Sequence, residues 1–308
     1  MKKPAVHVVS VLDGIKNKVS PSTRVLYAKG CDIVSDDKAG FEEAIKIAEE
    51  AEVIVAVMGE RSGLIWFNKE GQFTSGEGVD RPDLRLPGVQ EDLIKRLYET
   101  GKPIILVLIN GRPLSIGSIL PYVKAVIEAW YPGEEGGTAI ADVLFGDYNP
   151  GGRLPITVPQ DAGQLPLYYS RKHSSFNNYI YMESKPLFPF GYGLSYTTFD
   201  YSDLQVEPRE VPVEGEVSIS LTVKNTGSYE GDEVVQLYIS KEYASVARPV
   251  KELKGFKRVT LKPGEEKRIT FKLPAEVLAF YDRYMRLIIE PGLYKVMIGR
   301  SSEDIVLT

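Results

Sequence analysis

The first half of the chain alternates between two kinds of apolar pattern. Continuous aliphatic runs, typical of strands buried on both faces of a sheet, occupy residues 52–58, 103–109 and 123–130. Segments whose apolar residues recur three and four positions apart predict helices over residues 6–19, 39–50, 89–99, 115–120 and 137–145. Because strands and helices alternate, the pattern predicts an α/β fold with a mostly parallel sheet and helices on both faces.

The start of this alternation is unusual. An α/β domain of this kind normally opens with a strand, whereas this chain opens with the helix predicted over residues 6–19. The next predicted element is a short strand over residues 24–28 (RVLYA). We therefore expect a sheet that lacks its first strand, and an unpaired sheet edge favours association with another polypeptide.

The last third of the chain has a different pattern, with apolar and polar residues alternating at a period of two. Short strands separated by Gly and Pro turns are predicted over residues 217–224, 233–240, 254–261 and 267–273. A final hairpin is predicted between residues 285–290 and 293–299. This region fits an all-β sandwich of the fibronectin III-like type. Residues 147–200 are rich in Pro, Gly, Tyr and Phe, so the predicted organisation is an α/β domain over 1–160, an interdomain clasp over 161–204 and the sandwich over 205–308.

Composition excludes several classes of function. The formal net charge of −5 argues against nucleic acid or an anionic membrane as the main partner, and no apolar run is long enough to span a membrane. One cysteine and two histidines are too few for a typical zinc site, so neither a metal nor another cofactor is expected. The first residues lack the apolar core and cleavage site of a signal peptide, which favours a cytoplasmic location.

The most distinctive chemistry lies in the loop Thr74–Gln90 (TSGEGVDRPDLRLPGVQ). It follows the strand predicted over residues 52–58, at the edge where open α/β sheets bind ligands. A general acid needs a carboxyl group whose pKa is raised by desolvation or by a neighbouring carboxylate. Glu77 lies between Gly76 and Gly78, whose permissive backbone would let it enter a partner's cleft. Glu77 is therefore the first candidate for this role.

Other residues of the region have supporting roles in this prediction. Asp80 and Arg81 are expected to pair with each other and to brace the loop. Trp66 is expected to offer an apolar platform for one face of a sugar ring, with packing in a lid as the alternative. Glu70 and Glu60 are alternatives to Glu77, and a merely solvated surface loop also fits the composition.

A second glycine-rich segment, residues 131–147, follows a predicted strand and opens a helix. It has neither the dinucleotide nor the P-loop spacing of glycines, which argues against a nucleotide-binding protein. Its glycines fit close packing of a helix on a sheet, with the lining of a ligand cleft as the alternative.

Six segments identify a family when they are taken together. They are SGEGVDRPDLRLPGVQ (75–90), YPGEEGGTAIADVLFGDYNPGGRLPITVP (131–159), PLFPFGYGLSYTTFDY (186–201), VKNTGSYEGDEVVQLYIS (223–240), RPVKELKGFKRVTLKPGEEKRITFKL (248–273) and EPGLYKVMIGRSS (290–302). The chain resembles the C-terminal part of family 3 glycoside hydrolases, the β-glucosidase and β-xylosidase group. The resemblance implies the second and third parts of a three-part enzyme, an α/β sandwich and a fibronectin III-like domain, without the N-terminal (β/α)8 barrel.

The resemblance also implies a chemistry. Glu77 falls on the family's general acid/base, whereas the family's nucleophile is an aspartate on the barrel and is absent from this chain. The implied reaction is retaining hydrolysis of a β-linked oligosaccharide or aryl glycoside, which needs both carboxylates. A barrel chain or a homo-oligomer is the implied partner, and the isolated chain is expected to be inactive. A non-catalytic fragment that binds carbohydrate or a partner protein is the alternative.

Overall fold

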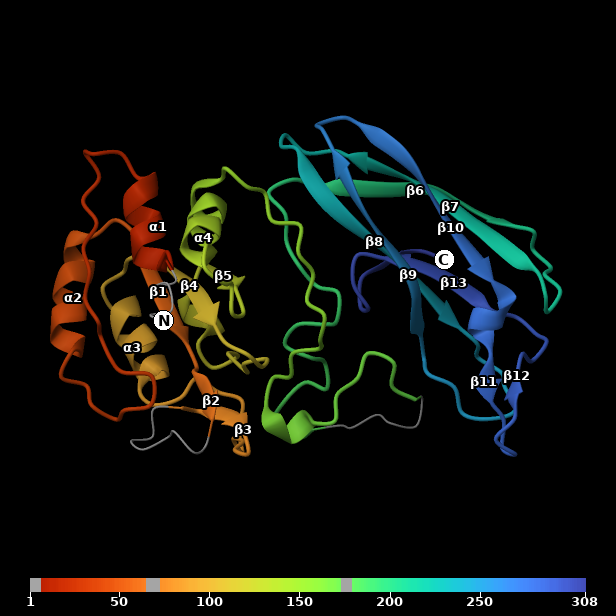
Figure 1. Ribbon diagram of the computed structural model, residues 1–308, viewed down its shortest axis with the longest axis horizontal. Coiled ribbons are helices and arrows are strands. Elements are labelled where there is room, and N and C mark those ends of the chain that lie inside the picture. Colours follow the sequence, from red (N-terminus) through yellow and green to blue (C-terminus); the bar gives the residue numbers. More distant parts are fainter. Residues whose placement is uncertain (1–6, 65–72, 173–178) are drawn as a thin grey trace, which may run out of the picture. The chain divides into compact units, whose positions relative to one another are not determined.

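The computed structural model describes residues 7–64, 73–172 and 179–308, which form two compact units (Figure 1). The first unit consists of Met1–Tyr148 with Pro159–Leu165. The second consists of Asn149–Val158 with Pro166–Thr308. Much of the Pro- and aromatic-rich segment between the two regular regions therefore belongs to the second unit.

The first unit is built on a parallel three-stranded sheet in the order β1-β4-β5. Its strands are β1 (Ile54–Gly59), β4 (Ile104–Ile109) and β5 (Ala125–Glu128). The central strand β4 is the most apolar, and Ile104, Leu106 and Val107 are fully buried. The predicted parallel sheet is confirmed. Strands β4 and β5 lie within the segments predicted for them, and β1 extends one residue beyond its segment, to Gly59.

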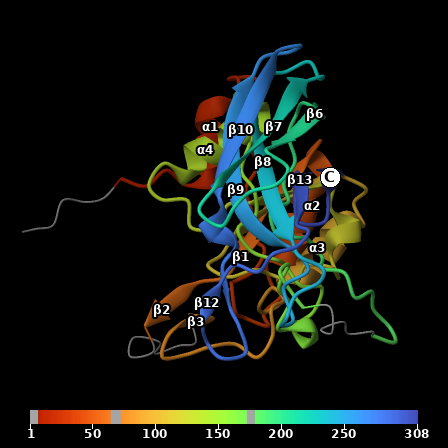
Figure 2. The ribbon, with the colours of Figure 1, turned by 90° about the vertical axis from the view of Figure 1, so that its right-hand side faces the viewer.

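Four helices cover this sheet, with α2 and α3 on one side and α1 and α4 on the other (Figures 1 and 2). Their bounds are α1 Val11–Lys18, α2 Phe41–Glu50, α3 Gln90–Tyr98 and α4 Gly136–Phe145. The pair α1 and α4 is closely packed, because a Cβ atom on Gly14 would lie 2.1 Å from the carbonyl oxygen of Gly137. Gly137 thus permits close packing of α4 against helix α1, whereas the sequence suggested packing of a helix against the sheet. Helix α4 ends at Gly146, whose φ of 84° is the left-handed conformation that glycine favours.

The short strand predicted over residues 24–28 is wrong. No strand occurs between α1 and α2, because no described residue provides a ladder for this extended segment.

Strand β1 consequently lies at a sheet edge. The amide of Ile54 bonds to Pro103 on the β4 side, so the main chains of Val55 and Val57 point the other way, where no described residue bonds to them. The side chain of Gln90 covers only the end of this edge, since it bonds both the N–H and the C=O of Gly59.

The helix predicted over residues 115–120 is also wrong. This stretch forms turns that lead into a single 3₁₀ turn, η2 (Leu120–Tyr122). Its apolar residues Ile116 and Ile119 are nevertheless almost fully buried. The spacing of the apolar residues therefore predicted their burial correctly. Pro121 and the shortness of the segment prevented a regular helix.

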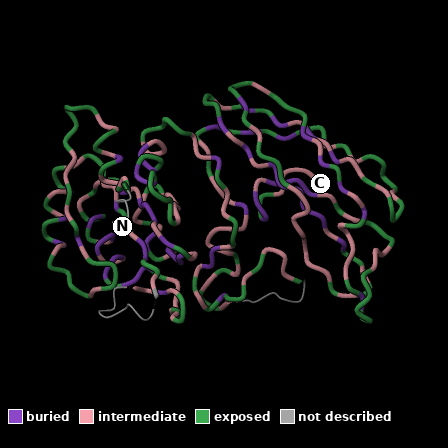
Figure 3. The backbone as a smooth tube through the Cα atoms, viewed as in Figure 1, coloured by how far each residue is buried: buried purple, intermediate pink, exposed green. Residues whose placement is uncertain are grey.

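The second unit is an antiparallel sandwich of two sheets, in the orders β10-β7-β6 and β14-β13-β8-β9. Its strands are β6 Phe199–Glu207, β7 Glu216–Asn225, β8 Gly231–Ser240, β9 Glu252–Leu261, β10 Glu266–Pro274, β13 Lys295–Gly299 and β14 Ile305–Leu307. Buried residues of both sheets form its core, among them Ile219, Leu237 and Leu261. Buried stretches of backbone occur in both units (Figure 3). The all-β sandwich is confirmed.

The predicted last hairpin is wrong. Residues of β12 (Leu287–Ile288) pair with β11 (Phe280–Tyr281) in a small separate hairpin, whereas β13 pairs with β8. Strand β13 is drawn into the large sheet because Met297 and Ile298 are buried there. In the part of the chain that the structure describes, no helix is both long and apolar enough to cross a membrane.

Candidate functional site

Glu77 lies at the tip of a tight turn at the end of strand β3 (Ser75–Glu77). Gly76 and Val79 bond to each other through both their N–H and C=O groups, at 3.0 and 3.2 Å, and so close the turn around Glu77 and Gly78. Gly78 has a φ of 77°, which a turn of this kind requires at its third position. Glu77 is exposed, and within the described residues its carboxylate has neither a hydrogen bond nor an ion pair.

Strand β3 is held by a second short strand, β2 (Ser62–Leu64), which pairs with it in parallel. Gly76 is essential to this pairing: its φ is 153°, and a Cβ atom there would lie 1.7 Å from the carbonyl oxygen of Gly63. The hydroxyl of Tyr131 accepts the amide of Ser62 at 3.1 Å and donates to the Ser62 hydroxyl at 3.0 Å. The turn that carries Glu77 is therefore tied, through β2, to Tyr131 in the segment that follows β5.

We expect Gly76→Ala to separate β3 from β2 and to release the turn. Hydrogen exchange of the amides of residues 74–80 should become faster, while exchange in α2 stays unchanged. Gly101→Ala is the matched control, because Gly101 also has a positive φ of 74° but has nothing within 4 Å of an added Cβ atom. Equal effects of the two substitutions on residues 74–80 would contradict the steric argument.

A cluster of ion pairs around the buried Glu60 carboxylate supports the loop Thr74–Gln90. The Glu60 side chain follows β1 and is fully buried, and its Oε2 atom lies 3.3 Å from Nη1 of Arg81. Its Oε1 atom lies 3.3 Å from Nε of Arg112, which is within ion-pair distance but outside hydrogen-bond geometry. The hydroxyl of Thr74 donates to Oε2 at 3.3 Å. One buried carboxylate thus joins two arginines from different parts of the chain.

Two carboxylates that follow Glu77 in the sequence, Asp80 and Asp83, complete this cluster. Asp80 pairs with the Arg112 guanidinium, which holds the pKa of the Asp80 carboxyl below its usual range. Asp83 accepts from Nη2 of Arg81 at 3.0 Å and from the amide of Arg85 at 3.0 Å. The expected side-chain pair of Asp80 with Arg81 is therefore wrong, because only the Arg81 amide, not its guanidinium, bonds to Asp80. Both residues do brace the loop, but through different partners.

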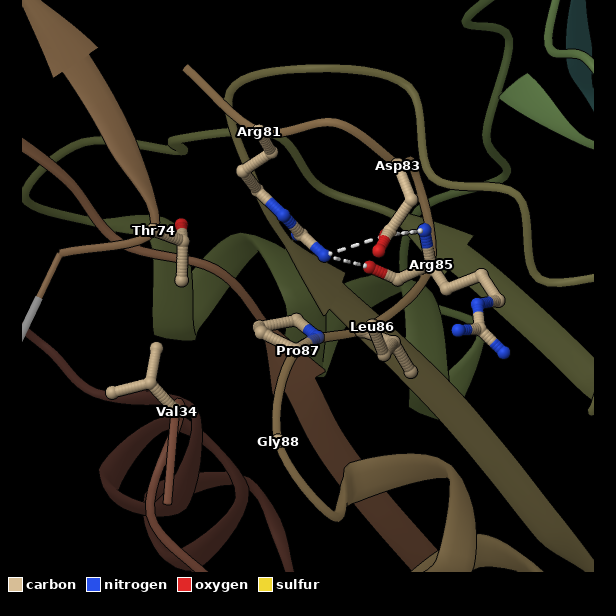
Figure 4. A pocket seen from close by; sticks show the side chains of 8 residues that line it. All are labelled: Val34, Thr74, Arg81, Asp83, Arg85, Leu86, Pro87 and Gly88. Carbon is tan, nitrogen blue, oxygen red and sulfur yellow. Dashed lines mark hydrogen bonds and ion pairs between the residues drawn. The ribbon is translucent and has the colours of Figure 1, made fainter. Parts of the chain in front are cut away.

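A surface pocket of about 330 Å³ adjoins this cluster (Figure 4). The Arg81 side chain reaches across it to Asp83 and to the carbonyl of Arg85, at 3.0 and 2.6 Å (Figure 4). The Arg85 guanidinium points away from these groups (Figure 4). The other residues that line the pocket are Val34, Thr74, Leu86, Pro87 and Gly88. The Arg81 guanidinium is already neutralised by Glu60 and Asp83, so it is not an unpaired charge that could bind an anionic ligand.

Polar residues also lie at the carboxyl ends of the neighbouring strands. Asn110 follows β4 and is fully buried, and its Nδ2 atom donates to the carbonyl of Arg112 at 2.7 Å. Glu128 is the last residue of β5, and its Oε1 atom accepts the amide of Trp130 at 3.3 Å. Burial raises the pKa of the Glu128 carboxyl to about 7, and the negative charge of Glu60 adds to this rise. Among the described residues, no group of three His, Cys, Asp or Glu side chains could hold a metal ion.

Comparison with known proteins identifies the fold of both units. Residues 2–196 match the glycosyl hydrolase family 3 C-terminal domain, and residues 233–302 match the fibronectin type III-like domain. The chain belongs to glycosyl hydrolase family 3. Among its family 3 relatives, it is 45% identical to a β-xylosidase of Formosa agariphila and 41% identical to a periplasmic β-glucosidase of Salmonella typhimurium. Each match covers 96% of this chain but only 40% and 41% of the relative.

Solved structures of β-glucosidases agree with this membership. A β-glucosidase of Erythrobacter marinus superimposes with a TM-score of 0.87 at 38% identity, over 97% of this chain and 42% of the other. A β-glucosidase of Listeria innocua in complex with glucose superimposes with a TM-score of 0.81 at 33% identity, over 89% and 38% of the two chains. The 308 residues therefore span about two fifths of the length of these relatives.

The family 3 fold brings together only some of the residues proposed from sequence. Glu77, Asp80, Arg81 and Glu60 lie in one loop-and-strand cluster in the first unit. Trp66 and Glu70 lie outside the described residues, so their proposed roles remain predictions. Sequence reasoning missed Arg112, Asn110 and Glu128. The available signal was their position, since each lies at or just beyond the carboxyl end of an apolar run, where parallel strands of one sheet end together.

Proposed function

We propose that this chain supplies the general acid/base for retaining hydrolysis of β-glycosides, and that Glu77 is that residue. The observation that carries the proposal is the contrast among the carboxylates of the cluster. Glu60, Asp80 and Asp83 are all engaged by arginines, whereas the exposed Glu77 carboxylate has no partner among the described residues. Glu77 is thus the carboxylate of this cluster that can exchange a proton with a substrate. Buried and paired, Glu60 fits a supporting role instead.

The reaction assigns Glu77 two steps. It protonates the glycosidic oxygen as the leaving group departs, and it then takes a proton from the water that releases the sugar. A second carboxylate must act as nucleophile at roughly 5–5.5 Å from the first in a retaining enzyme. We propose that this nucleophile comes from a (β/α)8 barrel outside these 308 residues. The printed activities of the relatives suggest β-glucosides and β-xylosides as substrates.

The free edge of β1 supports the need for further polypeptide. Its Val55 and Val57 main chains have no partner among the described residues, and Val57 is 45% exposed. An edge of this kind pairs readily with an added strand. It also favours the second candidate, a module that binds a partner protein without catalysis.

Reconstitution of activity tests the proposal. The chain is joined to the barrel polypeptide of a family 3 relative, and hydrolysis of 4-nitrophenyl β-glucoside and β-xyloside is measured. We expect hydrolysis from the joined protein and from neither part alone. Glu77→Ala should abolish most of it, whereas Glu49→Gln, on the exposed face of α2, should not. Full activity in Glu77→Ala would refute the assignment of Glu77, and binding of the barrel without activity would favour the non-catalytic module.

A further inference from the structure

Tyr131 follows strand β5, but its side chain makes its hydrogen bonds beyond the opposite edge strand, β1. Its hydroxyl accepts the amide of Ser62 at 3.1 Å and donates to the Ser62 hydroxyl at 3.0 Å. Ser62 is the first residue of β2, and β2 pairs with β3, the strand that ends at Glu77. One hydroxyl group therefore holds the start of the strand pair that presents Glu77.

The ring of Tyr131 lies against Gly111, the second residue after β4. A Cβ atom on Gly111 would lie 2.7 Å from Cε2 of this ring and 3.3 Å from its hydroxyl oxygen. Strand β4 lies between β1 and β5. The Tyr131 side chain thus extends from the end of β5, over Gly111, to the segment that follows β1. Glycine at position 111 leaves room for the ring.

The backbone before Tyr131 explains this direction. Trp130 has a φ of 52°, which a residue with a large side chain seldom adopts. Its amide donates to Oε1 of Glu128, and its carbonyl accepts the amide of Asn110, both at 3.3 Å. Backbone in such a conformation persists only where its surroundings hold it, and it is concentrated at functional sites. Here it turns the chain at the end of β5, so that Tyr131 lies over the end of β4.

The strand pair that Tyr131 holds has little stability of its own. It is three residues long, and an isolated pair of strands is at best marginally stable in water. In its register, Leu64 of β2 lies beside Glu77 of β3. The amide of Thr74 bonds to the carbonyl of Arg61 at 2.9 Å just before the pair begins. A displacement of Ser62 would therefore reach Glu77 through a ladder of three residues.

We propose that Tyr131 is a positioning residue, which fixes the direction of the Glu77 carboxylate by holding β2 in place. The effect on catalysis rests on the proposed function of Glu77, but the effect on β2 does not. A general acid must lie within about 2.6–3.2 Å of the oxygen that it protonates. A misplacement of about 1 Å can lower the rate roughly 10²-fold. A strand pair of three residues needs an anchor to hold a carboxylate within such limits.

Hydrogen exchange of the 308-residue chain tests the effect on β2. Tyr131→Phe keeps the ring over Gly111 and removes only the hydroxyl group. The amide of Ser62 loses its acceptor, so its exchange, followed by NMR, should become faster by up to roughly tenfold. The amides of β3 should also exchange faster. Tyr98→Phe is the matched control, because Tyr98 is a similarly exposed tyrosine of the same unit, in contact with Tyr122, and its variant should leave these amides unchanged.

Gly111→Ala tests the same contact without removing a polar group. The added methyl group would lie 2.7 Å from the Tyr131 ring, so the ring must move and its hydroxyl should leave Ser62. Exchange of the Ser62 amide should then become faster, as in Tyr131→Phe. In a Tyr131→Ala background the ring is absent, so Gly111→Ala should change this exchange no further. Equal effects of Gly111→Ala with and without the ring would contradict the argument.

Kinetics of the joined enzyme separates the direction of Glu77 from a loss of folding. Tyr131→Phe should lower kcat roughly 10–10²-fold for leaving groups that need a proton, with little change in KM. The burst of phenolate from 2,4-dinitrophenyl glycosides needs no proton and should be almost unaffected. A smaller folded fraction would instead lower both signals equally.

Two results would overturn the proposal. One is unchanged exchange of the Ser62 amide in both Tyr131→Phe and Gly111→Ala. The other is a loss in Tyr131→Phe that is equal for both leaving groups while the loss in Glu77→Ala depends on the leaving group. If the loss depends on the leaving group in neither variant, the assignment of Glu77 fails, and the catalytic part of this proposal fails with it. Faster exchange would still support the effect on β2, so the two failures can be told apart.

Discussion

Glu77→Ala in the reconstituted enzyme is expected to reduce hydrolysis according to how strongly the leaving group needs a proton. For unactivated alkyl or sugar leaving groups, loss of a general acid should lower kcat/KM by roughly 10²–10⁴-fold. For 2,4-dinitrophenyl glycosides the first step should be almost unaffected, because the phenolate leaves without protonation. The second step should then be slow, since no base is left to activate water. Such substrates should show a burst of phenolate followed by a low steady state.

Azide distinguishes this role from a loss of folding. A small anion can attack the glycosyl–enzyme intermediate without a general base, so azide should restore turnover of the dinitrophenyl substrate in Glu77→Ala. The product should be a glycosyl azide with retained β configuration, because it arises from a second inversion at the anomeric carbon. Asp83→Asn is the matched control: it alters a carboxylate of the same loop that is already engaged by Arg81. Azide that does not accelerate Glu77→Ala, or accelerates Asp83→Asn equally, would contradict the assignment.

The architecture could be predicted because burial leaves a clear trace in sequence. Strand β4 is apolar at every position and is the buried centre of its sheet. Strand β7 alternates because one of its faces meets the core. The errors in the strands occurred where pairing rather than burial decides. Residues 24–28 have the composition of a strand but no ladder partner, and β12 turned back on β11 because β13 is taken up by β8.

The site could be predicted at the level of the loop but not of its contacts. Glycines on both sides of Glu77 indicated an unusual turn, and both do have positive φ. The partners of its carboxylates could not be read from proximity in sequence, because Arg112 is 32 residues beyond Asp80 and meets it only when β1 and β4 lie side by side. Adjacent residues such as Asp80 and Arg81 send their side chains in different directions, which favours distant partners over neighbours.

Glu60→Ala is expected to destabilise the first unit by about 3–5 kcal/mol, because removing one partner of a buried ion pair leaves the remaining charges uncompensated. The Glu60 side chain has no exposed surface, and Arg81 is only 11% exposed, so water cannot replace the lost carboxylate well. Glu60→Gln should cost less, since an amide oxygen still accepts from the arginines, although it no longer neutralises them. Trp130 belongs to the first unit, and the sequence has no tryptophan after it, so the sandwich contains none. Tryptophan fluorescence during denaturant unfolding therefore follows this unit separately from the sandwich.

The exposed pair of Arg96 with Glu99 provides the comparison within the same unit. Both side chains are at least half exposed, so Glu99→Ala should cost less than about 1 kcal/mol. If Glu60→Ala lowers the free energy of unfolding by no more than Glu99→Ala does, the buried cluster adds nothing to stability. If Glu60→Ala instead lowers stability while Glu60→Leu with Arg81→Met and Arg112→Met restores it, the cluster is replaceable by apolar packing. The function of the ion cluster would then be to orient the Glu77 turn. The apolar triple variant removes the ion pairs of Arg81 with Asp83 and of Arg112 with Asp80, which hold that turn.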